Sequence, residues 1–533
     1  MESTILSAVR LVYHTSNPKE RTMLMTIQLY EGYLRNRAPL CRELGLTPGP
    51  DRRETELKIL GAGWRRWGRE VVRHLYGSFA FAIQDGESLF CARDAFGIQT
   101  FYYSVAEDGA FLYGPELRTV VRSPHYRKEL DRDALQLYLL FGYPVGERTL
   151  YEGVFKLMPG CTLLWDGKSV RIERWYSLSF HPENTVPEED WAQRIDGTLQ
   201  EILDEDRSCF ELTSGLSFLS GGVDSSYLLA SSGVREAVGI GFENADFSEA
   251  PFASAAADKL GARFREVRIS AEEYFESLPH FVRNLELPLS DPSAPAFAIG
   301  CEKLKGKRGP CFSGEGADEF FAGYRIYRRA GELGKEGAGY YGCDGLMEQE
   351  AAMKLLNTER AFPLETLIRE TGAQTCDAEQ LSRMLAVDIS LWLEGDILFS
   401  VGRSARANGI DLLLPFADRR MFELSAAIPA VLKRKGGTEK YILRKAAQTR
   451  IPQEIAFRPK VGFSIPARQW FREERFRLWI EQLLFGAVSR SFFDQEVLRT
   501  IWQSFLNGDE LVWRIPYAVI IFVLWYETCF AAE

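Results

Sequence analysis

A serine- and glycine-rich turn at residues 220–226, Ser-Gly-Gly-Val-Asp-Ser-Ser, constrains the fold of this chain more than any other segment. The largely apolar run 216–219 before it predicts a short buried strand, and the apolar run 227–230 after it predicts a helix. A strand, a glycine turn and a helix in this order begin a parallel α/β unit. The same periodicities predict strands at 238–242 and 265–269 and helices at 191–205 and 250–260.

The composition of this turn favours the binding of an anion such as pyrophosphate. Glycines lack Cβ atoms, so several backbone N–H groups can converge on one ligand, and the serine hydroxyls add donors. The helix N-terminus favours negative charge, and Asp224 is placed to bind Mg²⁺. The alternative is an ordinary turn that caps a helix and binds nothing. No Gly-Lys-Ser/Thr follows as in a Walker A loop, and the dinucleotide pattern G-x-G-x-x-G is absent.

Two motifs together resemble the asparagine synthetase family. Residues 220–226 resemble the S-G-G-x-D-S loop of ATP pyrophosphatases, which split ATP between the α and β phosphates and transfer AMP to a substrate oxygen. Residues 312–324, Phe-Ser-Gly-Glu-Gly-Ala-Asp-Glu-Phe-Phe-Ala-Gly-Tyr, are similar to the second signature of the family. Further segments that resemble this family are 291–293, 437–444 and 458–463, and 77–82 and 92–98 resemble its glutaminase domain.

The resemblance covers essentially the whole chain and implies two domains. Residues 1–180 are expected to form a degenerate type 2 glutamine amidotransferase-like domain, an α+β sandwich of the Ntn-hydrolase kind. Within it, the apolar runs 77–83 and 88–93 around Asp85-Gly86 predict a hairpin. Residues 190–533 are expected to form an α/β domain with a parallel sheet of the ATP pyrophosphatase type, with the ATP site at the carboxyl ends of its strands.

The resemblance also implies ATP and Mg²⁺ as cofactors and gives roles to individual residues. Asp224 and Asp318 would hold Mg²⁺ between phosphate oxygens, and Glu315 would be the general base for the attacking amine. Lys460 and Lys440 would neutralise charge as pyrophosphate leaves; the alternative for each is a solvated surface charge. The positions implied around the nucleotide are Leu219, Ser220, Gly221, Gly222, Asp224, Ser225, Ser226, Ile240, Ser313 and Gly314.

The N-terminal third departs from the family at its catalytic position. Glutaminases of this family use an amino-terminal cysteine, exposed after Met removal, as the nucleophile. Here residue 2 is Glu, and the first cysteine is Cys41. The family's Asn-Gly-Glu segment is replaced by Glu-Gly-Tyr at 31–33, and its Ser-Asp-Thr-Glu segment by Arg-Glu-Thr-Glu at 53–56. We therefore expect this domain to have no glutaminase activity.

A second departure lies in the helical region that faces the substrate in this family. The family's K-V-D-R is Ser-Val-Gly-Arg at 400–403, and its E-x-R-x-P-F-L-D is Asp-Leu-Leu-Leu-Pro-Phe-Ala-Asp at 411–418. A family Asp becomes Gly402 and a family Arg becomes Leu413. The loss of one acid and one base predicts a carboxylate substrate other than free aspartate. The alternative is the neutral loss of a structural ion pair.

Relatives with an intact synthetase half and a decayed glutaminase half include the β-lactam synthetases and the lasso-peptide macrolactam cyclases, in which an internal amine replaces ammonia. The β-lactam enzymes carry Tyr at the position of Glu315, which favours a peptide cyclase or another natural-product amide synthetase. The resemblance thus implies an ATP-dependent carbon–nitrogen ligase that forms AMP and pyrophosphate. A precursor peptide is a candidate substrate, with a leader-peptide-binding or protease partner. The alternatives are an ammonia-dependent asparagine synthetase and a non-catalytic nucleotide-binding homologue.

Composition excludes several other classes. Lys and Arg number 64 against 74 Asp and Glu, so the net charge of −10 argues against binding to nucleic acid by bulk charge. The nine cysteines include no CxxC pair, which favours free thiols in a reducing compartment, and we expect the cytoplasm. None of the five histidines lies in a nucleophile-elbow or metal motif, which argues against a hydrolase.

Two segments each allow two structures. Residues 330–385 match the family poorly and predict either a variable insertion or mobile lid, or an ordinary helical elaboration. The apolar run 517–526 is too short to span a bilayer, so we expect a buried C-terminal helix or strand.

Overall fold

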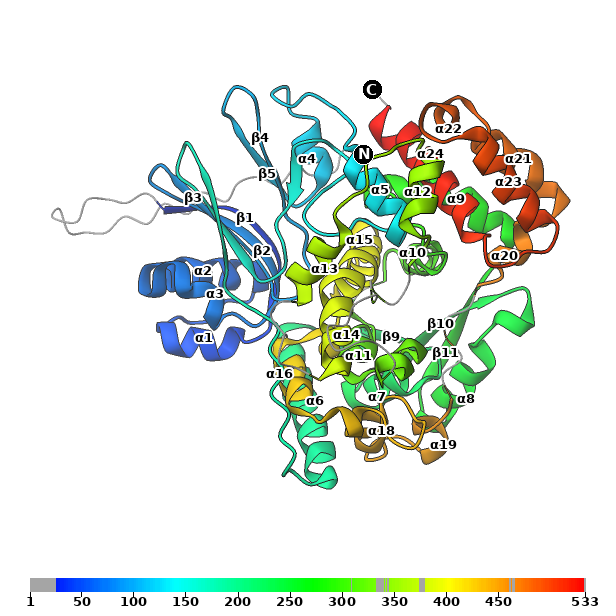
Figure 1. Ribbon diagram of the computed structural model, residues 1–533. Helices are drawn as coiled ribbons and strands as arrows, with labels where there is room; N and C mark the ends of the chain where they lie inside the picture. The colour runs from blue at the N-terminus through cyan, green and yellow to red at the C-terminus, as the bar shows by residue number, and fades with distance from the viewer. Residues whose placement is uncertain are drawn as a thin grey trace. The chain divides into compact units, whose positions relative to one another are not determined.

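The structure is a computed structural model that describes residues 25–307, 309–331, 340, 342, 345–372, 379–459, 462 and 465–531. The chain divides into two compact units (Figure 1). Unit 1 takes in the chain up to Glu129, together with Tyr151–Leu178 and Asp204–Cys209. Unit 2 takes in Leu130–Leu150, Ser179–Leu203 and the chain from Phe210 onward.

Unit 1 contains two antiparallel sheets. The first has five strands in the order β1-β2-β3-β7-β8, and the second has three in the order β5-β4-β6. Asp85 of β2 lies opposite Ser88 of β3, so the predicted hairpin is confirmed. The strands are β1 (Met25–Leu34), β2 (Gly77–Asp85), β3 (Ser88–Arg93), β4 (Tyr102–Val105), β5 (Phe111–Gly114), β6 (Val154–Lys156), β7 (Cys161–Trp165) and β8 (Val170–Arg174).

The two faces of β2 explain why its residues 78–83 are all buried. Phe79 and Phe81 belong to the core beneath the helices α1 (Arg37–Leu44), α2 (Arg52–Trp67) and α3 (Val71–His74). Ala80 and Ala82 belong to a second core with residues of the three-stranded sheet, such as Tyr103. Because alternate residues of a strand point to opposite faces, the strand separates these two cores. Figure 1 shows the three helices together on one side of the larger sheet. The Ntn-hydrolase character of this unit stays a prediction.

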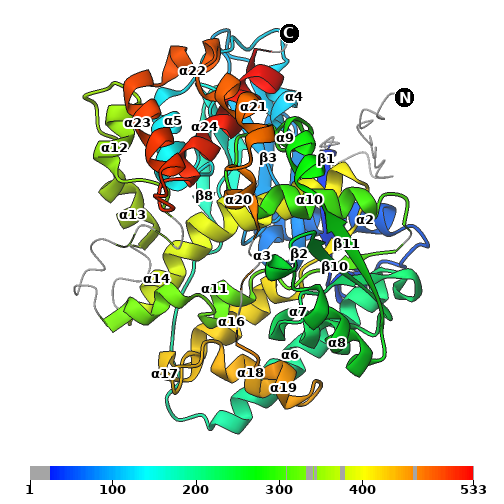
Figure 2. The same ribbon diagram turned by 90° about the vertical axis from the view of Figure 1, so that its right-hand side faces the viewer.

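Unit 2 is built on a parallel sheet of five strands in the order β11-β10-β9-β12-β13. This result confirms the predicted C-terminal α/β architecture with a parallel sheet. Helices α7 and α8 lie on one side of the sheet and α10 lies on the other (Figures 1 and 2). The strands are β9 (Leu216–Phe218), β10 (Glu236–Phe242), β11 (Arg263–Ile269), β12 (Cys311–Phe312) and β13 (Leu412–Leu413).

The remaining elements of unit 2 are mostly helices. All five predicted strands and helices between 216 and 269 are present, and the run 517–526 is helical rather than extended. The helices are α5 (Arg132–Phe141), α6 (Glu188–Cys209, which ends in unit 1), α7 (Val223–Ser232), α8 (Ala250–Leu260), α9 (Ala271–Leu285), α10 (Ser293–Lys303), α11 (Ala317–Phe321), α12 (Gln349–Leu355), α13 (Leu364–Gly372), α14 (Gln380–Asp388), a π-helical segment (Ile389–Leu398), α15 (Phe399–Ala407), α16 (Arg419–Ala427), α17 (Ala430–Lys433), α18 (Tyr441–Ala447), α19 (Gln453–Ala456), α20 (Ala467–Trp470), α21 (Glu474–Leu484), α22 (Ala487–Phe492), α23 (Gln495–Leu506) and α24 (Arg514–Trp525).

Helix α5 lies early in the sequence but packs in unit 2. Its Tyr138 hydroxyl is buried and donates to the carbonyl of Ala518 in α24. The predicted domains, 1–180 and 190–533, stay a prediction, because the compact units interleave along the chain. Of the segment 330–385, the structure describes α12, α13, the start of α14 and parts of the connections, and the choice between a variable insertion or lid and a helical elaboration stays a prediction.

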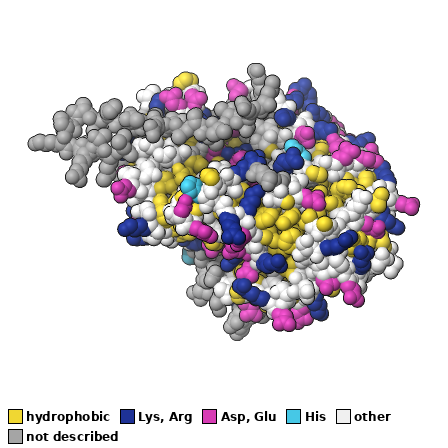
Figure 3. Space-filling model, turned by 90° about the horizontal axis from the view of Figure 1, so that it is seen from above, with side chains coloured by type: hydrophobic (Ala, Val, Ile, Leu, Met, Phe, Trp, Pro, Cys, Tyr) yellow, Lys and Arg dark blue, Asp and Glu magenta, His cyan; other side chains and the backbone are white. Residues whose placement is uncertain are grey.

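The described residues show the charge of the surface, the apolar length of the helices and the state of the cysteines. Acidic and basic side chains are interspersed among apolar ones on the face drawn in Figure 3. Within the described ranges, no helix combines the length and the apolar character that a bilayer crossing requires. Each cysteine in the described part of the chain is a free thiol.

Candidate functional site

The turn 220–226 follows β9 and is held by its own side chains. The hydroxyl of Ser225 accepts from the backbone N–H of Ser220 at 3.2 Å, and the two serine Oγ atoms lie 3.1 Å apart. The Oγ of Ser220 accepts from the N–H of Gly222 at 3.3 Å, and Gly222 is the N-cap residue of α7. These contacts fix the turn at the N-terminus of a ten-residue helix, where the helix field favours an anion.

Gly221 shows why this turn requires glycine. Its φ is +75°, and a Cβ there would lie 2.7 Å from the carbonyl carbon and oxygen of Phe252, in the first turn of α8. Real Cβ atoms do not approach backbone that closely, so the turn can lie against α8 only without a side chain at this position.

The second signature follows β12, the strand that pairs with β9. Cys311 pairs with Leu216 in parallel register, so the carboxyl ends of both strands lie at the same edge of the sheet. A Cβ on Gly314 would lie 3.2 Å from the Cβ of Asp224, which brings the two motifs into contact. The Ser313 hydroxyl donates to Oε1 of Glu315 at 3.0 Å. The structure therefore brings together Ser313, Gly314, Glu315 and the turn.

Lys440 joins the two predicted metal-binding carboxylates. Its Nζ lies 2.5 Å from Oδ2 of Asp224 and 2.7 Å from Oδ1 of Asp318, and its side chain is 2% exposed. Burial alone would lower the pKa of Lys440, but the two carboxylates outweigh it and raise the pKa, so the ammonium stays charged. This lysine is buried in the cluster and is not a solvated surface charge.

Gly323 packs directly against Asp318 and Lys440. A Cβ at this position would lie 1.9 Å from Oδ1 of Asp318 and 2.0 Å from Cε of Lys440. Both atoms would have to move, and the ion pair between them would break. The glycine near the end of the signature therefore has a steric role that follows from the position of the lysine.

The carboxylates fit a magnesium ion. Oδ1 of Asp224 is buried and has no hydrogen-bond partner among the described residues. Mg²⁺ is usually held by one or two carboxylates together with substrate phosphates, rather than by a full protein cage. No group of three or more His, Cys, Asp or Glu residues gathers as a metal centre in the ranges that the structure describes. Asp224 and Asp318 supply oxygen ligands of the required kind.

Glu319, the third acid of the signature, was not predicted from the sequence as a functional residue. It is 1% exposed, and Oε1 accepts from the Tyr324 hydroxyl at 2.6 Å, while Nε1 of Trp392 donates to the same hydroxyl at 3.3 Å. Burial, and then the charges of Asp318 and Glu315, raise its pKa to about 8. Its position directly after Asp318 is the sequence signal that could have identified it.

The other predicted positions lie on the neighbouring elements of unit 2 or outside the described residues. Leu219 is buried and its N–H donates to Val238 in the neighbouring strand at 2.8 Å. Ile240 lies on β10, and Ser226 is buried in α7. Lys460 and Glu2 fall outside the described residues.

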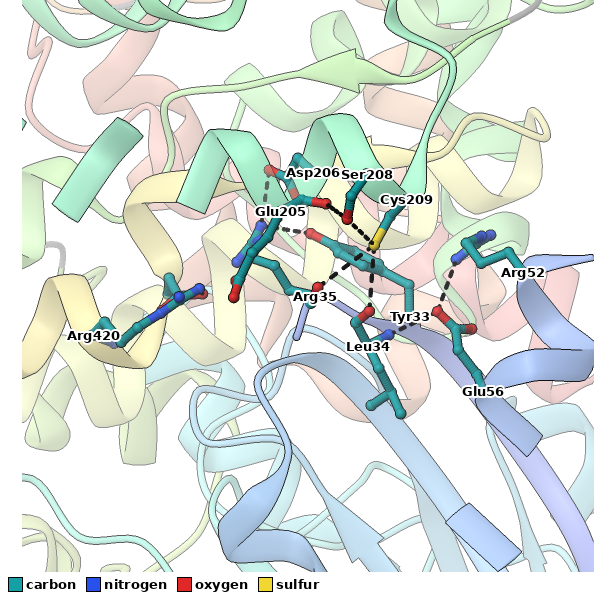
Figure 4. Close-up of polar contacts among 11 residues, drawn as sticks. Tyr33, Leu34, Arg35, Arg52, Glu56, Glu205, Asp206, Ser208, Cys209 and Arg420 are labelled. Atoms are coloured by element: carbon teal, nitrogen blue, oxygen red, sulfur yellow. Dashed lines mark hydrogen bonds and ion pairs between the residues drawn. The ribbon is translucent and has the colours of Figure 1, made fainter. Parts of the chain in front are cut away.

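In unit 1, Tyr33, which replaces the acid of the family's Asn-Gly-Glu segment, has a structural contact (Figure 4). The Tyr33 hydroxyl accepts from Nη2 of Arg35 at 2.7 Å, and Nε of Arg35 donates to Oδ1 of Asp206 at 2.8 Å. Arg35 and Asp206 are both buried. Glu56 accepts from the N–H of Leu34 at 3.0 Å, and burial raises its pKa. Tyr33, Arg35 and Asp206 therefore form a chain of hydrogen bonds, and Glu56 bonds to the backbone beside it.

The second departure from the family also has a structural setting. Leu413 is fully buried in β13, opposite Phe312 of β12, and its carbonyl accepts from the N–H of Ser313 at 3.1 Å. An apolar side chain suits this core position. Arg403 lies 3.2 Å from Glu286 and donates to the carbonyl of Asn284, so this arginine is engaged in the helical core.

Comparison with known proteins covers both halves of the chain. Residues 214–527 match the family model described as asparagine synthase, and residues 6–176 match the glutamine amidotransferase domain. Asparagine synthetase [glutamine-hydrolyzing] 1 of Bacillus subtilis is 28% identical, over 94% of this chain and 85% of its own length. A putative asparagine synthetase [glutamine-hydrolyzing] of Mycobacterium tuberculosis is 29% identical, over 87% of this chain and 78% of its own length.

Proposed function

The chain belongs to the asparagine synthase family, and on this premise we propose that it joins an adenylated carboxylate to an amine that does not come from glutamine. Family membership makes it an ATP-dependent carbon–nitrogen ligase that forms AMP and pyrophosphate. The observation that carries the proposal is the meeting of Asp224, Asp318 and Lys440 beside the turn 220–226.

In the proposed reaction, the turn binds the leaving phosphates. Backbone N–H groups and the hydroxyls of Ser220 and Ser225 would donate to the β and γ phosphates at the start of α7. Asp224 and Asp318 would hold Mg²⁺, which neutralises phosphate charge when it is bound. The carboxylate oxygen of the substrate attacks the α phosphorus, the bond to the β phosphate oxygen breaks, and pyrophosphate leaves.

Lys440 and Glu315 would act in successive steps. The Lys440 ammonium is held at the carboxylates and supplies positive charge where pyrophosphate develops negative charge. Glu315, oriented by the Ser313 hydroxyl, would take a proton from the amine as it attacks the acyl adenylate. AMP then leaves and an amide remains. Lys460 is proposed to assist pyrophosphate departure.

Two features support an amine other than ammonia from glutamine. Tyr33 replaces the acid of the family's Asn-Gly-Glu segment, and its hydroxyl accepts a hydrogen bond from Arg35. Leu413 is an apolar core residue where the family has an arginine, which supports a substrate other than free aspartate. We therefore propose a peptide macrolactam cyclase of the lasso type, or a related natural-product amide synthetase, with a precursor peptide as substrate and a leader-peptide-binding protein or protease as partner.

An ammonia-dependent asparagine synthetase is the second candidate. It is favoured by the relatives of Bacillus subtilis and Mycobacterium tuberculosis, which are named asparagine synthetases and cover most of this chain.

Product analysis separates the two candidates. Purified full-length protein is incubated with MgATP and either a precursor peptide encoded near its gene or aspartate with ammonium, and pyrophosphate and products are measured. We expect pyrophosphate with the peptide and a product lighter by one water. Asparagine as the sole product would support the second candidate, and no pyrophosphate with any carboxylate of a broad panel would contradict both.

A further inference from the structure

Two arginines that sequence analysis did not single out lie beside the candidate site. Arg444 lies on α18, one helical turn after Lys440, and is 4% exposed. Its guanidinium donates to three backbone carbonyls: Nε to Glu439 at 2.8 Å, and Nη1 to Ala456 at 2.7 Å and to Arg458 at 2.8 Å. The planar guanidinium of Arg444 therefore connects the residue before Lys440 to the last residue of α19 and to the segment that follows this helix.

Arg458 continues this connection to the turn 220–226. Its Nη1 donates to the carbonyl of Ser220 at 3.4 Å, and its Cζ lies 3.7 Å from the ring centroid of Phe252. Its Nη2 lies 3.5 Å from Glu249, just before α8. Phe252 belongs to the backbone segment that covers Gly221. Arg458 thus contacts both the turn and the helix against which the turn packs.

The backbone at Lys440 needs such support. Its φ is +52°, in the left-handed region that residues with a Cβ rarely adopt. This conformation begins α18 and directs the side chain to Asp224 and Asp318. A residue in an unfavourable conformation persists only where its surroundings hold it. The Glu439 carbonyl, part of the peptide unit before Lys440, is held by Arg444.

We propose that Arg444 and Arg458, together called the arginine brace, position the Lys440 ammonium and the turn 220–226 for MgATP. Both are positioning residues, because they contact backbone carbonyls, Phe252 and Glu249. The proposal rests on the proposed function, since it assumes that MgATP binds at the turn. It goes further by assigning affinity for the nucleotide to residues outside the two motifs.

A double-mutant cycle tests whether Arg444 acts through Lys440. The dissociation constant of MgATP is measured by titration calorimetry for the unaltered full-length protein, Arg444→Met, Lys440→Met and the double variant. We expect Arg444→Met to weaken binding by about tenfold, because charge-assisted hydrogen bonds are lost. In the Lys440→Met background, the same substitution should have little further effect, because the group that it positions is gone.

Further variants separate positioning from general loss of packing. Arg444→Lys keeps the charge but cannot reach three carbonyls at once, so it should also weaken binding; it replaces Arg444→Met if that variant does not fold. Arg458→Gln should weaken binding through the turn. The matched control is Arg450→Met, which removes an arginine that pairs with Asp196 at 2.7 Å and does not contact the turn. Its affinity for MgATP should be unchanged.

The outcomes distinguish the brace from the proposed function. If the unaltered protein binds MgATP and the Arg444 and Arg458 variants bind it equally well, the brace is wrong while the proposed function stands. If Arg444→Met weakens binding to the same extent with and without Lys440, Arg444 does not act through the lysine and the proposal is overturned. If the unaltered protein does not bind MgATP, both are contradicted.

Discussion

The polar residues of the two units are used in different ways. In unit 2, the predicted carboxylates of Asp224 and Asp318 lie together with the ammonium of Lys440. The Oδ1 atom of Asp224 is buried and accepts no hydrogen bond from the described residues. In unit 1, Tyr33, Arg35 and Asp206 bond to one another in the interior (Figure 4). Buried polar groups that satisfy one another stabilise a fold, whereas a buried oxygen left over in a charged cluster marks a place for a ligand. The comparison therefore supports the proposed site in unit 2 and a structural role for Tyr33, Arg35 and Asp206 in unit 1.

The largest effect should come from Lys440→Met. Removing the ammonium leaves Asp224 and Asp318 facing each other without a counter-charge and removes positive charge from the leaving pyrophosphate. We expect ATP-dependent pyrophosphate formation to fall by about 100- to 1,000-fold, as for other losses of a transition-state donor. A steady-state pyrophosphate assay measures this loss. Near-normal activity of Lys440→Met would contradict the proposal that the cluster in unit 2 is the reactive site.

In unit 1, Arg35→Met should reduce stability. The substitution removes the buried ion pair between Arg35 and Asp206, and breaking a buried ion pair typically costs about 3–5 kcal/mol. Denaturant unfolding of the full chain measures the loss. The double variant Arg35→Met, Asp206→Leu should recover most of it, because no unpaired charge remains. A small loss in the single variant would show that this pair does not stabilise the unit.

Gly323→Ala tests the packing of the cluster itself. The new Cβ would overlap Asp318 and Lys440, so we expect an overpacking cost of about 1–3 kcal/mol and weaker pyrophosphate formation. Gly197→Ala on α6 is the matched control, since a Cβ there meets nothing within 4 Å. The control should be neutral or slightly stabilising, by up to about 1 kcal/mol. Equal behaviour of both variants would contradict the geometry of the cluster.

The smallest expected effect is a pH dependence at the start of α6. Hydrogen bonds from Lys435 and Lys445 lower the pKa of Glu188 to about 2, and Tyr441 also donates to this carboxylate. Because the folded-state pKa lies below the ordinary value of 4.5, the stabilisation is present above pH 4.5 and is lost as the pH falls toward 2. Glu188→Gln should flatten stability between pH 5 and pH 2, about the range of that shift, in denaturant titrations. An unchanged pH profile would contradict this assignment.

The sequence predicted those features that short segments encode. The turn 220–226 and the second signature each follow a buried strand, and the order of parallel strands then brings Asp224 and Asp318 to one edge of the sheet. The hairpin at Asp85-Gly86 was predictable for the same reason, since turn chemistry and strand periodicity are local.

Other features depend on contacts between distant segments. Lys440 meets Asp224 across 216 residues, and Arg35 meets Asp206 across 171 residues. Periodicity gives the helix α5 but not the core that it joins, so its packing in unit 2 required the structure. Arg444 was missed because an arginine that bonds only to backbone carbonyls leaves no pattern in sequence.

The most direct test of the account measures glutamate and pyrophosphate in one reaction. The full-length protein is supplied with MgATP, glutamine, a carboxylate substrate and its amine. The account predicts that pyrophosphate accumulates with the amide product while glutamate stays at the level of a protein-free control. Glutamate formed in step with pyrophosphate would show that unit 1 hydrolyses glutamine and would contradict the division of roles between the two units.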